Sequence, residues 1–224
     1  MSDIVIADTK HNTTKVSSEK LLFSSKDFRS QVKGDWANVY PPIRARMDRL
    51  LTSSTPVIFE GRGLVRRSRI GGVFAYLAKI FGAPLVFKRG ENVKITVRVA
   101  PTSNDLRCWH RLFTYSDGYE QLVQTSKAMD SKLGFIDAVG AEGERRLATK
   151  MNVWTEGKSL YFSSCVYVLR FKHFNIPIPL MFTPGALFAE HRDLGKGMFR
   201  YILKFNHPLW GETFYQDGIF KMLD

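Results

Sequence analysis

The stretch "ENVKITVRVAP", residues 91–101, decides the fold, because its hydrophobicity repeats every second residue. An apolar set of side chains alternates with a polar set: Val93, Ile95, Val97 and Val99 against Asn92, Lys94, Thr96 and Arg98. Successive side chains of a strand point to opposite faces of its sheet. The pattern therefore predicts a β-strand with one buried face and one wet face.

The chain after this stretch continues as strands joined by tight turns. "LRCWHRLFTY" and "YEQLVQTSKAM" flank Ser-Asp-Gly, "RRLATKMNVWTE" and "KSLYFSSCVYVLRF" flank Glu-Gly-Lys, and "GALFAEHRDL" and "GMFRYILKFN" flank Gly-Lys. We expect nine or ten strands in an antiparallel meander, ending in "ETFYQDGIFKM". A long meander protects its edges by curling and closing. The predicted fold class is α+β, mainly β, with a curved sheet or barrel as its body.

Two helices are expected before the meander, separated by the strand "PVIFEGRGLVRRS". "YPPIRARMDRLLTSS" has prolines suited to a first helical turn, and "GGVFAYLAKIFGAP" ends at Gly82 and Pro84. Each has one apolar face, made of Ile43, Met47, Leu50 and Leu51 in the first helix and of Val73, Phe74, Leu77, Ile80 and Phe81 in the second. We expect both to cover one end of the barrel. A START-like helix-grip fold is the rival, but it needs a long C-terminal helix where this chain reads as a strand.

The first 34 residues are rich in Ser, Thr and Lys and show little periodicity. We interpret residues 1–34 as a disordered basic tail and residues 35–224 as a single β-rich domain. The two cysteines form no disulfide framework or zinc motif, and no secretory signal or membrane-spanning run is evident, so a cytoplasmic location is expected. No phosphate-binding loop, dinucleotide fingerprint or metal-ligand spacing is present, so we expect neither a cofactor nor a metal.

The formal net charge of +12 allows anionic partners. Two arginine clusters contribute, one with Arg44, Arg46 and Arg49 and the other with Arg62, Arg66, Arg67 and Arg69. Neither belongs to a motif that reads nucleic acid, so nucleic-acid binding is not expected. The clusters form either an ordinary solvated face or a contact with an anionic membrane surface.

The strand "CWHRLF" is the most distinctive candidate for a binding site. By alternation, Arg107, Trp109, Arg111 and Phe113 share one face. The arginines either reach past Trp109 to water, or Arg111 points into an apolar cavity as its polar anchor. A buried arginine needs an acidic partner, and Glu190 is a candidate.

Glu190 shares a strand face with Phe188. It forms either an ion pair with His191 or Arg192, or an inward carboxylate that meets Arg111 or a ligand. Asp137 is a second acidic candidate. Tyr201 and Tyr215 either supply hydroxyl groups to the same cavity or belong to an ordinary core.

Several motifs, taken in order, resemble a known family. These are "CWHRLF", "LGFIDAVG", "IPIPLMFTPGALFAE" and "GMFRYILKFNHPLWGETFYQDGIF". Together they are similar to the bacterial domain-of-unknown-function family number 4166, over about residues 37–222. The matching positions are Trp109, Arg111, Phe113, Asp137, Gly140, Pro177, Pro179, Pro184, Glu190, His207, Pro208, Gly211, Tyr215 and Gly218. The chain departs from the family pattern at Asp137, where a Glu is expected, and in "YQDG", which has one extra residue. The family's association with dehydrogenase-like chains and membrane proteins suggests apolar metabolites or lipids.

The leading hypothesis is a binding module that holds an apolar small molecule, lipid-like or aromatic, in a β-barrel cavity. Arg111 and Glu190 would be its anchors, and Trp109, Phe113, Phe188, Tyr201 and Tyr215 its walls. The alternative is an isomerase or cyclase acting on an apolar substrate, with Glu190 or Asp137 as acid or base and Arg111 stabilising negative charge. A basic peripheral-membrane or nucleic-acid-binding protein is the third hypothesis.

Overall fold

The computed structural model describes residues 25–79, 85–101, 107–139, 147–171 and 174–223. The helices are α1 (Ser25–Gln31), α2 (Pro41–Thr52) and α3 (Arg69–Lys79), with 3₁₀ turns η1 (Trp36–Asn38) and η2 (Leu180–Phe182). The strands are β1 (Val32–Lys33), β2 (Val57–Arg67), β3 (Gly90–Pro101), β4 (Arg107–Thr114), β5 (Glu120–Asp130), β6 (Gly134–Val139), β7 (Leu147–Glu156), β8 (Ser159–Arg170), β9 (Asn175–Ile178), β10 (Ala186–Gly195), β11 (Met198–His207) and β12 (Gly211–Leu223).

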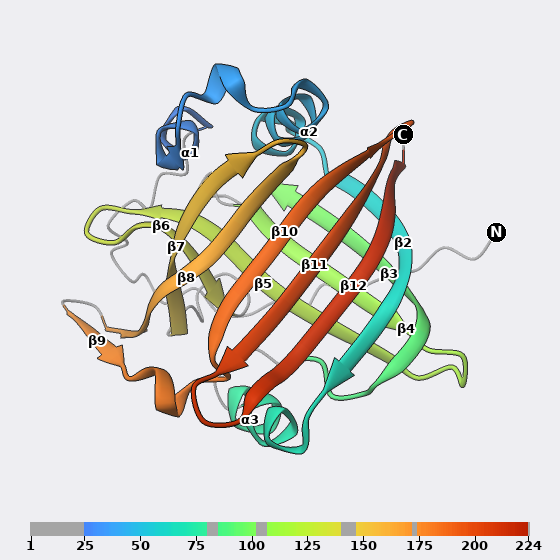
Figure 1. Ribbon diagram of the computed structural model, residues 1–224, viewed down its shortest axis with the longest axis vertical. Helices are drawn as coiled ribbons and strands as arrows, with labels where there is room; N and C mark the ends of the chain where they lie inside the picture. The colour runs from blue at the N-terminus through green and yellow to red at the C-terminus, as the bar shows by residue number, and fades with distance from the viewer. Residues whose placement is uncertain (1–24, 80–84, 102–106, 140–146, 172–173, 224) are drawn as a thin grey trace, which may run out of the picture.

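Ten of these strands form a closed antiparallel barrel (Figure 1). Each barrel strand from β2 to β12 pairs with the next along the chain, and β12 returns to pair with β2. The pairing of β7 with β8 completes the ring. β1 adds in parallel to β7, and β9 adds to β8. Closure removes the exposed edges that a long open meander would carry.

The predicted meander and its alternation are confirmed. In β3, Val93, Ile95 and Val99 are buried inside the barrel. The chain ends on the long strand β12, which pairs with β2 and β11. The helix-grip rival, which needs a terminal helix at this place, is therefore not the fold.

The expectation that two helices cover one end of the barrel is wrong. Figure 1 shows α2 at one end and α3 at the opposite end. The reason is β2, whose 11 residues join them. At about 3.3 Å per residue, such a strand runs roughly 36 Å and crosses the whole barrel wall.

The buried face of α3 also differs from the expected one. Gly71 and Ala75 are buried, whereas Val73 and Leu77 are exposed. A Cβ added to Gly71 would lie 2.0 Å from the Thr213 carbonyl oxygen, so this glycine lets the helix approach the start of β12 closely. With Gly71 and Ala75 on the buried side, Val73, Tyr76 and Leu77 keep much of their surface exposed. Ile80 and Phe81 lie outside the described residues.

Part of the expected N-terminal tail belongs to the folded body. Residues 1–24 lie outside the described residues, but residues 25–33 form α1 and β1. Phe28 of α1 is buried against Phe135 of β6, with ring centroids 5.1 Å apart, and the Arg29 side chain pairs with Asp48 of α2. The folded part therefore begins before Asp35. In the part of the chain that the structure describes, no helix is long and apolar enough to cross a membrane.

Candidate ligand-binding cavity

The barrel encloses a cavity of about 500 Å³. Small-molecule sites typically occupy about 300–1,000 Å³ and combine apolar walls with a few placed polar groups. The wall here is mostly aliphatic and aromatic, with contributions from every barrel strand and from helices α1, α2 and α3. Its charged side chains within the described residues are Arg111, Lys127 and Asp137, and His191 also lines it.

The polar groups of the wall form a row across neighbouring strands. Strand register places Lys127 of β5 opposite Asp137 of β6, Asp137 opposite Thr149 of β7, and Thr149 opposite Tyr167 of β8. Directly opposed side chains on one face lie about 4.5–5.5 Å apart at Cβ. The register therefore builds a polar strip on a mostly apolar wall.

Arg111 lies beside this strip on β4 and is only 8% exposed. Its Nη1 donates a 3.1 Å hydrogen bond to Thr125 Oγ1. Among the described residues no carboxylate lies within 4 Å of its guanidinium group, so it has no ion-pair partner there. The predicted pairing with Glu190 does not form.

Lys127 and Asp137 pair with each other, with Nζ and Oδ2 2.7 Å apart. The Lys127 ammonium also lies 5.0 Å from the centroid of the Trp109 ring. Burial lowers the pKa of Lys127, and Asp137 opposes that shift. The other carboxylate oxygen of Asp137, Oδ1, is buried without a hydrogen-bond partner among the described residues.

Two tyrosines add hydroxyl groups to the polar part of the wall. Burial raises the pKa of Tyr201, while Arg111 opposes the shift and Asp137 adds to it. Burial also raises the pKa of Tyr167, whose hydroxyl donates to the Gly185 carbonyl at 2.8 Å. Both phenols are therefore neutral donors in the physiological pH range.

One end of the cavity is closed by α2. Its buried Arg46 donates to His191 Nε2 at 2.8 Å and pairs with Asp193 Oδ1 at 2.9 Å. The His191 ring stacks on Phe199, with centroids 4.2 Å apart. Burial, and secondarily Arg46, lowers the pKa of His191 to about 3, so this histidine is neutral and accepts the bond from Arg46.

The other end is bordered by α3, η2 and the β11–β12 turn. A second hollow, of about 370 Å³, lies there between Ile70, Val73, Phe74, Leu77, Met181, Phe182 and Trp210. Phe74, Leu77 and Phe182 line this hollow and the large cavity as well. Phe182 is 75% exposed. These three side chains therefore separate the cavity from the surface.

The structure places four of the seven predicted ligand-binding residues on the cavity wall: Trp109, Arg111, Phe113 and Tyr201. Asp137, predicted as an acidic candidate, also lines it. The proposed roles of these residues in ligand binding or catalysis stay predictions.

The other three predicted residues, Phe188, Glu190 and Tyr215, face outward. In β10, Leu187, Ala189 and His191 line the cavity, so the alternating residues point away from it. Phe188 packs outside against the rings of Trp154 and Tyr161. In β12, Phe214 and Gln216 line the cavity, so Tyr215 points away from it. The Arg66 guanidinium carbon lies over the Tyr215 ring, 4.6 Å from the ring centroid.

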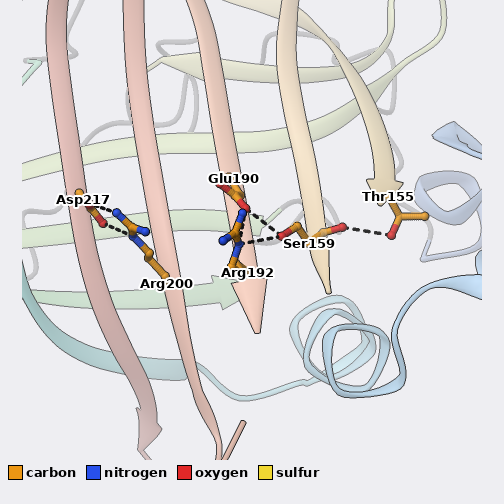
Figure 2. A network of polar contacts seen from close by, with 6 residues as sticks. All are labelled: Thr155, Ser159, Glu190, Arg192, Arg200 and Asp217. Carbon is orange, nitrogen blue, oxygen red and sulfur yellow. Dashed lines mark hydrogen bonds and ion pairs between the residues drawn. The ribbon is translucent and has the colours of Figure 1, made fainter. Parts of the chain in front are cut away.

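Figure 2 shows where Glu190 lies instead. Its Oε1 accepts bonds from Ser159 Oγ at 2.8 Å and Arg192 Nε at 2.7 Å. The ion pair with Arg192 that the sequence allowed is therefore formed. Arg200 and Asp217 form a second ion pair on the neighbouring strands. The first group links β8 to β10, and the second links β11 to β12.

Sequence reasoning missed six polar residues of the wall: Thr125, Lys127, Thr149, Tyr167, Thr183 and Gln216. The signal for two of them was present. In "YEQLVQTSKAM", alternation puts Thr125 and Lys127 on the face of the apolar Val123. The polar character of both residues, by itself, assigns them to solvent, and only the closed barrel reveals that their face is inward.

The basic residues are not gathered on one face. Arg46 is buried, and the arginines of α2 lie at one end of the barrel. The second arginine cluster runs along β2 to the opposite end, where α3 begins. No group of three His, Cys, Asp or Glu side chains that could hold a metal occurs within the described ranges.

Comparison with known proteins adds the family. No curated protein and no solved structure matches this chain. The family model described as a domain of unknown function, DUF4166, matches residues 40–220, which include α2, α3, nine barrel strands in full and most of β12. The chain is a member of the DUF4166 family.

Proposed function

We propose that this protein binds an apolar small molecule inside its barrel. The observation that carries the proposal is the cavity of about 500 Å³, whose wall is mostly apolar and holds a minority of polar groups. An apolar ligand of matching size would make dispersion contacts with this lining. The hydrophobic effect would drive an apolar molecule into it.

The ligand enters between α3 and η2. Phe74, Leu77 and Phe182 there belong to both the cavity and the surface hollow, and Leu77 and Phe182 are exposed. The opposite end is blocked by α2 and the buried Arg46–Asp193 pair. Exposed apolar side chains in a contiguous patch mark binding sites, which fits an entrance for an apolar molecule.

Acid–base catalysis is a weaker candidate for the same cavity. It needs a desolvated carboxylate that is free of a cation, so that its pKa is raised. Glu190 lies on the outer side of the wall, and Asp137 is paired with Lys127 at 2.7 Å. The geometry favours binding over proton transfer.

Fluorescence titration with N-phenyl-1-naphthylamine, a neutral apolar probe, tests the proposal. We expect saturable binding to the wild type and a large loss in Leu203→Trp, which fills the cavity from β11. Leu122→Trp is the matched control, because Leu122 is exposed on β5 while its neighbour Val123 lines the cavity. Equal binding by both variants would rule out the cavity as the site. Native mass spectrometry of gently purified protein would show a co-purified ligand directly.

A further inference from the structure

We infer that the ligand is an amphipathic acid: an apolar body carrying one negatively charged head group, a carboxylate, that binds to Arg111. The inference rests on the proposed function and names the class of molecule that the cavity takes. Its basis is the environment of the Arg111 guanidinium group.

Arg111 carries a buried charge without a protein counter-ion among the described residues. The side chain is 8% exposed and lines the cavity, and its hydrogen bond goes to the neutral hydroxyl of Thr125. A guanidinium group stays protonated in proteins, so it cannot escape the cost of burial by losing its proton. Buried charges are ordinarily paired. A ligand anion would supply the missing partner.

The charge of the cavity wall agrees with a singly charged anion. Among the described lining residues, Lys127 and Asp137 neutralise each other at 2.7 Å. His191 is neutral, because burial lowers its pKa to about 3. Arg111 is left as the uncompensated charge of that lining. One negative head group therefore brings the interior to neutrality.

The neighbouring hydroxyls can complete the head-group site. Thr125 Oγ1 accepts its bond from Arg111, so its own hydrogen can donate to a ligand. Tyr201 lines the same cavity as Arg111, and its hydroxyl is a neutral donor because burial raises its pKa. A guanidinium group and two hydroxyls would then donate to one carboxylate, and a planar guanidinium fork matches a carboxylate with two parallel bonds. The surrounding apolar wall fits the rest of the molecule.

Two matched fluorescent probes test the inference. 1-Anilinonaphthalene-8-sulfonate is N-phenyl-1-naphthylamine with an added sulfonate, so the pair differs by one negative charge. We expect Arg111→Met to weaken binding of the anionic probe about 10–100-fold, the value of a hydrogen bond to a charged group, and to leave binding of the neutral probe unchanged. Arg62→Met is the control, because it removes the same charge from an exposed position of β2.

A competition experiment on the wild type supports the same test without a variant. Decanoate and decanol share one chain and differ in the head group. We expect decanoate to displace the neutral probe at a concentration about tenfold lower than decanol does. That result establishes carboxylate recognition even if Arg111→Met does not fold, which a cooperative thermal transition and near-ultraviolet circular dichroism would reveal.

The outcomes separate the two proposals. If the neutral probe binds in the cavity but decanoate and decanol compete equally, the acid inference is wrong and the apolar binding function stands. A folded Arg111→Met variant that binds both probes like the wild type also overturns the acid inference alone. If neither probe binds the wild type, both proposals fail.

Discussion

Replacing Arg46 tests how α2 is fixed to the barrel. Arg46 projects from α2 into the protein, where it pairs with Asp193, donates to His191 and stacks over the Phe199 ring at 4.7 Å. Its side chain is 6% exposed and that of Asp193 is 3% exposed. The variant Arg46→Leu keeps an apolar side chain on the helix and removes the charge. Asp193 then keeps its bond from the Gly195 amide but loses the guanidinium group that balances its charge.

The expected cost follows from the burial of the remaining carboxylate. Removing one partner of a buried ion pair destabilises a protein by about 3–5 kcal/mol, because it leaves an uncompensated charge in the interior. In a protein of this size, 1 kcal/mol lowers Tm by roughly 2–4 °C. We therefore expect Arg46→Leu to lower Tm by about 6–20 °C. Urea unfolding at pH 7, monitored by fluorescence, measures the free energy directly.

A double-mutant cycle separates the buried charge from lost packing. Asp193→Asn should restore part of the stability of Arg46→Leu, because the double variant has no unpaired charge. Arg66→Leu is the control, because the exposed Arg66–Glu212 pair spans 3.3 Å at the surface and should contribute at most about 1 kcal/mol. If Arg46→Leu costs no more than this control, the ion pair does not hold α2 and the reasoning is refuted.

Three further predictions concern single residues. Burial lowers the pKa of His191 to about 3, so below pH 6.5 the unfolded chain binds a proton that the folded protein does not. Stability should therefore fall by about 1 kcal/mol more between pH 6 and pH 5 in the wild type than in His191→Gln, and equal losses in urea unfolding would contradict this. Gly185 has φ +117°, and an added Cβ would lie 2.4 Å from the backbone of Asn206, so Gly185→Ala should cost at least about 2 kcal/mol. Gly157→Ala, at φ +55° with no atom within 4 Å of the added Cβ, should cost only about 1 kcal/mol. Thermal melts of both variants measure the two losses of stability, and equal losses would contradict the argument from close approach. Glu190→Gln should leave the affinity for N-phenyl-1-naphthylamine unchanged in a fluorescence titration, because Glu190 bonds to Ser159 and Arg192 outside the cavity; a marked loss would place it in the site.

Alternation along single strands predicted a large part of this protein. The apolar positions of residues 91–101 point inward as expected, and so do Trp109, Arg111 and Phe113. The antiparallel meander follows from strands joined by short turns. These features are local, so they can be predicted from neighbouring residues in the sequence. The closure pairs β2 with β12, which are far apart in the chain, and it could be expected only because a long meander must protect its edges.

The inward face could not be predicted where both faces of a strand are apolar. In β10, the outward Phe188 is larger than the inward Leu187 and Ala189, so side-chain size and hydrophobicity suggest that Phe188 points inward. Glu190 shares the face of Phe188, so it is assigned to the interior as well, which is wrong. On the outside of the barrel, the Phe188 ring packs against the rings of Trp154 and Tyr161, which belong to two other strands. Such a contact between distant segments leaves no periodic signal in the strand itself.

The two ends of the barrel differ in a way that bears on ligand exchange. At the α2 end, opening would separate the buried Arg46–Asp193 ion pair and leave each charge without its partner. At the α3 end, the side chains between cavity and surface are Phe74, Leu77 and Phe182, which make apolar contacts without a buried ion pair among them. Local opening is cheapest where few buried contacts must be broken, and already exposed side chains such as Phe182 have little burial to lose. The position of one strand, β2, sets this asymmetry, because it fixes the two helices at opposite ends and leaves the barrel with one tightly held cap and one apolar entrance.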